Sequence, residues 1–202
     1  YKSVDGGLSW DSLAVTATNT NGFDSDFDFI WNLKTDPSND SIDVVYAATY
    51  GSIYKSEDGG DSWVKQLGGG SAYYTNVEIT TSGVVYATIS TYYSPSTDHG
   101  IWKSIDGQNW TNITDSLFPP VYGRIAIGVN PSNEDEVYFL AAETDNYGQH
   151  TNVFFGGEAW TSLWKYNAAS DAWVDLSLNI PANQSTSFDN FNAQGGYDLM
   201  VK

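Results

Sequence analysis

Two stretches of the sequence, 90–100 and 143–162, combine aromatic side chains with carboxylates and histidine. Their candidate ligand-binding residues are Tyr92, Tyr93, Asp98 and His99 in the first stretch and Tyr147, His150 and Trp160 in the second. Aromatic rings stack on the apolar faces of sugars, and carboxylates accept hydrogen bonds from sugar hydroxyls. These residues are therefore predicted to contact a carbohydrate or an extracellular protein. The alternative is that the aromatic residues of the second stretch only fold their own loop onto the rest of the protein.

Arg124 is the single arginine of the chain, and it forms a second candidate ligand-binding pair with Asp198. Such a pair could bind an anionic or hydroxylated ligand, or it could be an ion pair that only holds neighbouring repeats together. Glycoside hydrolysis would require two suitably spaced carboxylates. Because the chain has 25 Asp and Glu residues, many pairs are conceivable and no catalytic residue is assigned.

The sequence offers one candidate metal site. Asp24, Asp26 and Asp28 alternate with other residues, and on a strand they would place three carboxylates on one face, which could seat Ca²⁺. A solvated strand face explains this spacing equally well. His99 and His150 have no partner at metal-ligand spacing, so neither a zinc site nor any other cofactor is expected.

Length and charge limit the classes of function. The chain has 202 residues, no cysteine, 8 Lys and Arg, and a formal net charge of −17. Binding of nucleic acid or of anionic membranes requires clustered basic residues, so neither is expected as a partner. No apolar run reaches the roughly 18 residues that span a bilayer, so membrane insertion is not expected. The length fits one domain or a little more.

A short motif recurs along the chain. Its residues stand at Ser3, Asp5, Gly7 and Trp10, then at Ser56, Asp58, Gly60 and Trp63, then at Ser104, Asp106 and Trp110, and finally at Trp173. We expect a tight hairpin turn in which the Asp carboxylate accepts backbone N–H groups, glycine supplies a positive φ, and the Trp ring packs between repeats. A structural role is therefore predicted for these residues.

The motif copies after the first follow two β-branched and aromatic runs of strand length, such as 30–34 and 44–47. Each repeat is thus expected to contain four antiparallel strands, which we call A to D in chain order. Four-stranded repeats of this length indicate an all-β fold, a β-propeller arc. The expected pieces are the end of a blade at 1–16, complete blades at 27–67, 75–114 and 122–178, and the first strand of another blade at 197–202. The remaining blades of the same propeller are expected partners.

The two ends of the blades are predicted to differ. In an antiparallel meander the A–B and C–D turns lie at one end, and the B–C and D–A connections lie at the other. The long connections, including 90–100 and 143–162, all belong to the second end, where binding residues are expected. Alignment of the A strands places Ile30, Asn76, Arg124 and Asp198 at equivalent positions near the mouth of a central channel.

The Ser-x-Asp-x-Gly-x-x-Trp motif resembles the Asp-box, or bacterial neuraminidase repeat, of sialidases, xyloglucan-active glycoside hydrolases and sortilin-type receptors. The resemblance implies a secreted or cell-surface propeller whose boxes are structural and lie away from the active site. Sialidases of this kind use three arginines, and this chain has one. The expected function is a non-catalytic module that recognises glycans or proteins. The alternative is part of a sialidase- or xyloglucanase-like hydrolase whose active site is completed by missing blades.

Overall fold

The computed structural model describes residues 1–18, 20, 22–70, 72–92, 98–152, 158–181 and 199–201. This part of the chain forms three antiparallel sheets and three short 3-10 turns, η1 (Ala14–Thr16), η2 (Asp26–Asp28) and η3 (Ser177–Asn179). Within it, no helix is long and apolar enough to cross a lipid bilayer.

In the first two sheets neighbouring strands follow one another in the chain, whereas the third sheet departs from this order. The first blade contains β1 (Ile30–Thr35), β2 (Val45–Thr49), β3 (Ser52–Ser56) and β4 (Val64–Gly68). The second contains β5 (Thr75–Ile79), β6 (Val85–Ile89), β7 (Gly100–Ser104) and β8 (Thr111–Asn112). The third contains β9 (Ile125–Val129), β10 (Glu136–Ala142), β12 (Glu158–Asn167) and β13 (Ala172–Asp175), with β11 (Gln149–Asn152) paired to the first part of β12. In this third sheet β10 pairs with β12, and β11 pairs with β12 as well.

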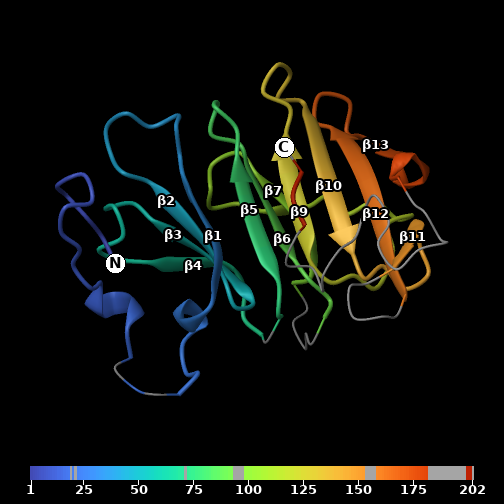
Figure 1. The fold of residues 1–202 in the computed structure, drawn as a ribbon. Helices are drawn as coiled ribbons and strands as arrows, with labels where there is room; N and C mark the ends of the chain where they lie inside the picture. The colour runs from blue at the N-terminus through green and yellow to red at the C-terminus, as the bar shows by residue number, and fades with distance from the viewer. Residues whose placement is uncertain are drawn as a thin grey trace.

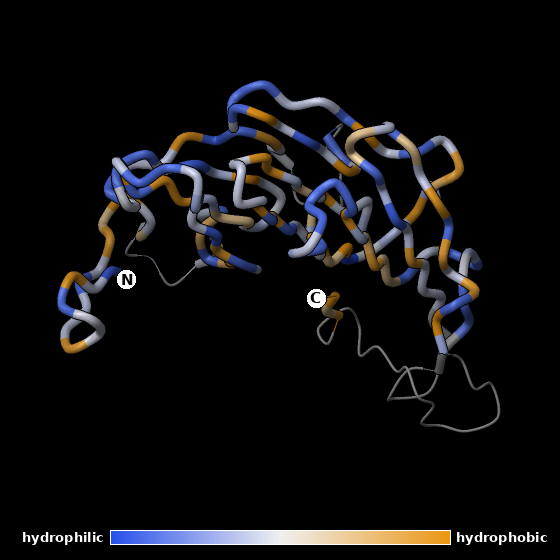
Figure 2. The backbone as a smooth tube through the Cα atoms, turned by 90° about the horizontal axis from the view of Figure 1, so that it is seen from above, coloured by the Kyte–Doolittle hydropathy of each residue, from blue (hydrophilic) through white to orange (hydrophobic). Residues whose placement is uncertain are grey.

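The three blades stand side by side, and strands β1, β5 and β9 are neighbours (Figure 1). Viewed from above, the blades form a curved arc, and residues 199–201 lie on its inner side (Figure 2). The predicted all-β arc of four-stranded antiparallel blades is therefore confirmed.

Two large clusters of the core each lie between a pair of neighbouring blades. Tyr46 and Ile53 of the first blade pack with Val77 and Ile89 of the second. The equivalent cluster between the second and third blades contains Tyr86, Ile101, Ile125, Phe139, Trp164 and Tyr166. Inner strands such as β6 are buried on both faces, which explains why they appear in the sequence as continuous apolar runs.

The repeated motif forms the expected turn. Ser56 Oγ accepts the Gly60 amide at 2.7 Å and donates to Asp58 Oδ1 at 2.7 Å. Asp58 also accepts the amide of Ser62 at 2.8 Å and its hydroxyl at 2.5 Å. The turn at Asp5 repeats this pattern with Ser9, and the turn at Asp106 uses Asn109 instead. The predicted motif did not include Ser9, Ser62 or Asn109. In each turn, this residue donates two hydrogen bonds to the motif carboxylate.

These hydrogen bonds favour the ionised carboxylate. Those from Ser9 lower the pKa of Asp5 to about 2. Those from Ser62 and Asn109 lower the pKa of Asp58 and of Asp106 in the same way. Each of these turns therefore holds a charged side chain at every pH above the acid range.

The four motif tryptophans do not share one environment. Trp110 packs against the cluster between the first and second blades, and Trp173 packs against the next cluster, as expected. Trp63 is half-buried beside Phe27, with 5.4 Å between ring centroids. Trp10 is 61% exposed, so the prediction that its ring packs between blades is wrong. The reason is that 1–18 makes a single β-bridge, between Lys2 and Asp11, and forms no sheet in the described part of the chain.

The fourth copy closes differently from the other three. Asp171 adopts a left-handed conformation with φ 52°, and its carboxylate accepts the Tyr166 hydroxyl at 2.8 Å. The contact replaces the serine and aspartate pair of the other turns. The hairpin spacing survives because a different local hydrogen bond supports it.

Two expectations about local structure are wrong. Residues 24–28 are not a strand, because Ser25 caps η2 and Asp28 accepts the amides of Asp24 and Ser25. The three carboxylates therefore do not share one face of a strand. The stretch 143–162 is not simply a loop, because β11 and the beginning of β12 form an antiparallel ladder within it.

The predicted alignment of the A strands, which matched Ile30 and Arg124 with Asn76, is wrong by two residues in β1 and by two residues in β9. Cross-strand pairing places Asn32 opposite Ala48, Asn76 opposite Thr88, and Ala126 opposite Leu140. Asn76 is therefore equivalent to Asn32 and Ala126, whereas Arg124 precedes β9. Register depends on the pairing partner, which the run of strand residues does not specify.

Candidate functional site

The two ends of the blades carry different kinds of connection. The A–B and C–D turns of the second and third blades lie at the upper end in Figure 1, and the C–D turns contain the motifs. The D–A and B–C connections lie at the other end, as the strand order requires. We call this end the loop face, and it is where the structure gathers a group of aromatic residues.

Six aromatic residues form a continuous group at the loop face of the first and second blades. This aromatic cluster consists of Phe23, Phe29, Trp31, Tyr50, Tyr73 and Tyr74. The ring centroids of Phe29 and Trp31 are 4.7 Å apart, and those of Trp31 and Tyr74 are 4.8 Å apart. Phe23 reaches Tyr50 at 5.7 Å. The cluster joins residues from the strand β1, a B–C turn and two D–A connections.

A β-bulge positions the central ring of the cluster. The pairing of β1 with β2 shifts between Ile30 and Asn32, so Trp31 is the extra residue. A bulge redirects a side chain relative to the regular strand. Trp31 Nε1 then donates to the Tyr73 carbonyl at 2.7 Å, which ties β1 to the connection before β5.

The cluster remains partly open to solvent. Phe23 is 64% exposed, Tyr74 is buried, and the other four residues are half-buried. A group of large rings that neighbouring side chains do not fully cover offers apolar faces to a ligand. The aromatic cluster is thus a prominent candidate binding surface on the loop face.

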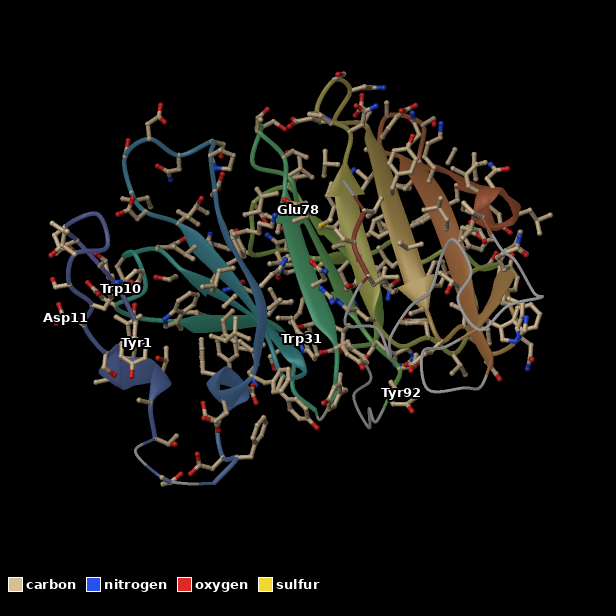
Figure 3. All side chains as sticks on the ribbon, viewed as in Figure 1. Tyr1, Trp10, Asp11, Trp31, Glu78 and Tyr92 are labelled. Carbon is tan, nitrogen blue, oxygen red and sulfur yellow. The ribbon has the colours of Figure 1, made fainter. Side chains whose placement is uncertain are left out.

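Two of the predicted site residues flank this cluster. The Arg124 guanidinium lies 5.5 Å from the centroid of the Trp31 ring, close enough for a cation–π interaction. Burial lowers the pKa of Arg124 from its ordinary value, but an arginine remains charged at neutral pH. Tyr92 is 38% exposed, and its carbonyl accepts the Tyr73 amide at 3.2 Å. Figure 3 labels Tyr92 and Trp31 at the loop face.

Asp98, in the same stretch as Tyr92, contacts the end of the first blade. Asp98 Oδ2 accepts the Gly68 amide at 3.2 Å, and its carbonyl accepts Trp102 Nε1 at 2.9 Å. These bonds connect the second blade to the end of β4. His99 is exposed. Tyr93 and Asp198 lie outside the described residues, so the pairing of Asp198 with Arg124 stays a prediction.

The predicted residues of the second stretch belong to a different place, on the third blade. Tyr147 stacks on Trp164 with 5.8 Å between ring centroids, and its hydroxyl donates to Asp175 at 2.9 Å. Burial and this hydrogen bond raise the pKa of Tyr147 to about 12. His150 and Trp160 face each other across β11 and β12 at 5.2 Å. The aromatic cluster, by contrast, is built from the first two blades.

One unusual carboxylate lies at the loop-face end of β10. Glu143 has a left-handed backbone with φ 57°, and its Oε2 is buried without a hydrogen-bond partner among the described residues. Burial raises the pKa of Glu143. Gly123 lies directly against this carboxylate, since a Cβ there would fall 2.2 Å from Oε2. Nothing in the sequence distinguished Glu143 from the other acidic residues.

The carboxylates near η2 are engaged in other contacts. Asp26 accepts the Tyr54 hydroxyl at 2.8 Å and pairs with Lys65 at 3.0 Å. Asp24 accepts the hydroxyls of Thr18 and Thr20. In the part of the chain that the structure describes, no three His, Asp or Glu residues are grouped so that they could hold a metal ion.

Sequence reasoning missed the aromatic cluster as a unit. Its members are scattered over 23–31, 50 and 73–74, and none belongs to the two long stretches in which ligand-binding residues were predicted. A signal was present in the aromatic density of 23–31. That these rings form one surface with Tyr73 and Tyr74 depends on the bulge at Trp31 and on the packing of the first two blades.

Comparison with known proteins points to one group of β-propeller enzymes. No family model matches the sequence. A curated xyloglucanase of Paenibacillus sp is 28% identical over 157 residues, which is 70% of this chain but 15% of that protein. The chain therefore spans less than a fifth of the curated relative's length.

Two solved structures resemble the fold. The GH74 enzyme of Niastella koreensis superposes with a TM-score of 0.54 at 20% identity, over 84% of this chain and 25% of that one. The GH74 xyloglucanase from Xanthomonas campestris gives a TM-score of 0.52 at 17% identity, over 87% of this chain and 25% of that one. At these identities the likeness establishes the fold, an arc of a β-propeller.

Proposed function

We propose that this chain is part of an extracellular glycoside hydrolase that acts on xyloglucan, and that the aromatic cluster forms part of its sugar-binding surface. The observation that carries the proposal is the partly open group of aromatic rings on the loop face. The sequence similarity to a xyloglucanase supports the same substrate class. Of the two functions expected from the sequence, this similarity favours the hydrolase over the non-catalytic recognition module.

The chemistry of the cluster suits a neutral polysaccharide. The C–H faces of a pyranose ring are apolar and stack on aromatic rings, whereas its hydroxyls require polar partners at the edges. Phe23 and Tyr50 offer ring surface, and Tyr73 adds a phenol group. Arg124 and Tyr92, at the border of the cluster, are proposed to donate hydrogen bonds to sugar hydroxyls. Asp98 and His99 are proposed to line the same surface.

The two carboxylates that cleave the glycosidic bond are not assigned within this chain. Such a pair must flank the scissile bond at a spacing of about 5–10 Å. We propose that the chain supplies binding surface and that other blades complete the pair. The motif turns at Asp5, Asp58 and Asp106 are proposed to be Asp-boxes with a purely structural role, at the end of the blades opposite the loop face.

Binding by the chain tests the proposal directly. Isothermal titration calorimetry with a xyloglucan oligosaccharide would compare the wild type with Phe23→Ala and Tyr50→Ala. Loss of one stacking ring is expected to weaken binding about 10-fold, because it removes roughly 1–2 kcal/mol of burial and stacking. Trp10→Ala is the matched control, since Trp10 is 61% exposed and Phe23 is 64% exposed.

The outcomes separate the two functions. Equal binding by the wild type and both cluster variants would show that the cluster is not the sugar site. Binding by a longer protein that contains this chain, without release of reducing ends from xyloglucan, would favour the recognition module instead of the hydrolase.

A further inference from the structure

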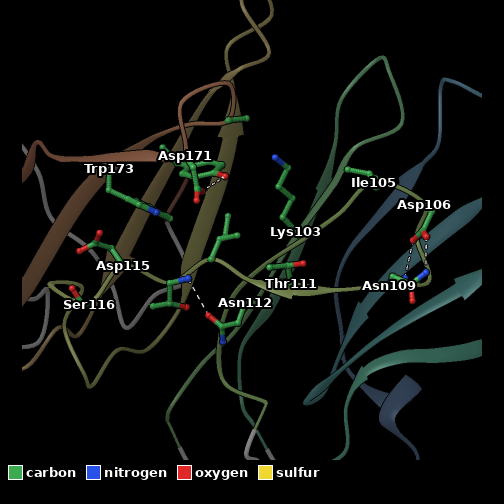
Figure 4. Close-up of a pocket in the computed structure, with 14 residues that line it drawn as sticks. Lys103, Ile105, Asp106, Asn109, Thr111, Asn112, Asp115, Ser116, Asp171 and Trp173 are labelled. Carbon is green, nitrogen blue, oxygen red and sulfur yellow. Dashed lines mark hydrogen bonds between the residues drawn. The ribbon is translucent and has the colours of Figure 1, made fainter.

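A cavity lies between the second and third blades and contains no residue of the aromatic cluster. Its volume is about 770 Å³. We call it the outer groove, and its principal lining residues are Lys103, Thr111, Asn112, Thr114, Asp171 and Trp173. They come from the C and D strands of the second blade, the segment that follows β8, and the C–D turn and strand β13 of the third blade (Figure 4).

The preceding pair of blades forms a smaller version of this groove. The equivalent space between the first and second blades has a volume of about 300 Å³. Val64 is the counterpart of Thr111, because each follows a motif tryptophan, and Lys55 is the counterpart of Lys103. In the smaller space Lys55 is 8% exposed and pairs with Glu57 at 2.8 Å. The outer groove is therefore an enlarged version of a feature that the repeat forms elsewhere.

The enlargement coincides with the loss of an ion pair. Ile105 stands where the first blade has Glu57, so the ammonium group of Lys103 has no carboxylate at that position. Its Nζ lies 5.6 Å from the centroid of the Tyr166 ring. Lys2, Lys34, Lys55, Lys65 and Lys165 each pair with a carboxylate. Among the described residues, Lys103 is the one lysine with no carboxylate within salt-bridge distance, and it lines a cavity.

The remaining lining groups combine an aromatic wall with neutral hydrogen-bonding groups. Trp173 and Tyr166 pack together at 5.0 Å between ring centroids, and both line the groove. Thr111 and Asn112 are exposed on β8 and present a hydroxyl and an amide. A cavity of several hundred Å³ with aromatic walls and a few polar groups is the usual form of a small-molecule site.

The charges of the groove favour a neutral polar ligand over an anionic one. Asp106, Asp115 and Asp171 line the same cavity as Lys103, and the whole chain carries a net charge of −17. An anionic ligand would meet more negative than positive charge there. A neutral ligand with many hydroxyls could accept from Lys103, donate to the carboxylates and stack on the aromatic wall.

We propose that the outer groove is a second carbohydrate site, which binds a neutral oligosaccharide separately from the aromatic cluster. The choice of ligand class rests on the proposed function, whereas the location does not. A site beside the outer strands β8 and β13, at the side of the blades away from β5 and β9, would hold the polysaccharide without taking part in its cleavage. Two separate sites on one chain would raise the avidity of the protein for a long polymer.

The test is an NMR titration of the ¹⁵N-labelled chain with a xyloglucan oligosaccharide. Amide shifts are expected at Thr111, Asn112 and Thr114 as well as at the aromatic cluster. Thr111→Trp fills the groove, and it should abolish the groove response while the cluster response persists. Val64→Trp is the matched control at the equivalent position, and both responses should remain. Lys103→Met keeps the aliphatic stem but removes the ammonium group, and should weaken groove binding about 10-fold.

The results distinguish this proposal from the proposed function. A response at the cluster without one at the groove overturns the second site and leaves the proposed function intact. If the wild type shows amide shifts at the groove but none at the aromatic cluster, and Phe23→Ala keeps the groove shifts, the proposed sugar surface is overturned instead. Equal or tighter binding of polygalacturonate would overturn the assignment to neutral sugars. If Thr111→Trp does not fold, Lys103→Met decides: unchanged groove affinity in that variant overturns the second site.

Discussion

Asn32 on β1 and Asn76 on β5 join the first two blades through their side-chain amides, with Asn32 Nδ2 donating to Asn76 Oδ1 at 2.9 Å. The same Nδ2 donates to the Val77 carbonyl at 2.8 Å, and Asn32 Oδ1 accepts the Val77 amide at 3.3 Å. One side chain thus satisfies a backbone donor and a backbone acceptor of the neighbouring blade. Val77 is fully buried, so water cannot readily replace these bonds.

Asn32→Ala should therefore destabilise the protein by about 1–3 kcal/mol, because it leaves the buried polar groups of Val77 without partners. Urea denaturation followed by circular dichroism measures the change in the free energy of unfolding. Asn133→Ala is a suitable control, since Asn133 is exposed in an A–B turn. Equal stability of the two variants would show that this contact does not hold the blades together.

The motif carboxylate predicts a stability change that depends on pH. Asp58→Ala removes the acceptor of the Ser56 and Ser62 bonds, and should lower Tm by about 2–4 °C at pH 7. The pKa of Asp58 is lower in the folded state than in the unfolded state, so its stabilising effect is complete above about pH 4 and is lost as the pH falls through the folded-state value. Differential scanning calorimetry at pH 7, 5 and 3 measures the difference in Tm between the wild type and Asp58→Ala. This difference should be smaller at pH 3 than at pH 5 and pH 7.

Asp61→Ala provides the comparison for Asp58. Asp61 lies in the same turn, but its side chain is 67% exposed and pairs with Lys2 at 3.2 Å. A surface pair of this kind contributes little to stability. If Asp61→Ala lowered Tm as much as Asp58→Ala, the hydrogen bonds of the turn would not be the cause.

Glu143→Gln should have the opposite dependence on pH. Burial raises the pKa of Glu143 in the folded state, so the native carboxyl favours folding while protonated and loses this advantage as the pH rises through the folded-state pKa. Replacement by the neutral amide should increase Tm at pH 7 relative to the wild type and change it little near pH 4. Asp145→Asn, at an exposed carboxylate of the same loop, should shift Tm by less at both pH values. A lower Tm for Glu143→Gln at pH 7 would contradict this account.

Gly51 cannot accept a side chain. Its φ is +75°, and a Cβ would fall 2.1 Å from the Gly70 carbonyl and 2.9 Å from the Ala72 amide. Gly51→Ala should cost more than about 3 kcal/mol, since backbone atoms must move in addition to the strain of the positive φ. Gly6→Ala is the matched control, because Gly6 has φ +72° with nothing within 4 Å, and it should cost about 1–2 kcal/mol. Similar urea midpoints for the two variants would rule out the clash.

The sequence predicted the fold well because the signals for the fold are local. The turn around Asp58 is encoded between Ser56 and Trp63, and strands such as β6 are encoded by their own apolar residues. The aromatic cluster was not predictable in the same way. Trp31 reaches Tyr73 only because of a bulge, and Asn76 matches Asn32 only once the strands are in register. Both depend on contacts between segments far apart in the chain.

The local hydrogen bonds of the motif turns have a consequence for how the chain folds. The side chains of Ser56 and Asp58 bond to groups no further along the chain than Ser62, so the hairpin of β3 and β4 can form before any other blade exists. Closing a loop of this size takes on the order of 10–100 ns, whereas the docking of preformed units takes milliseconds or longer. We therefore expect each hairpin to set its own register early. Neighbouring blades would then assemble from units that are already correctly paired, and slipped or mismatched edges would be rare during synthesis on the ribosome.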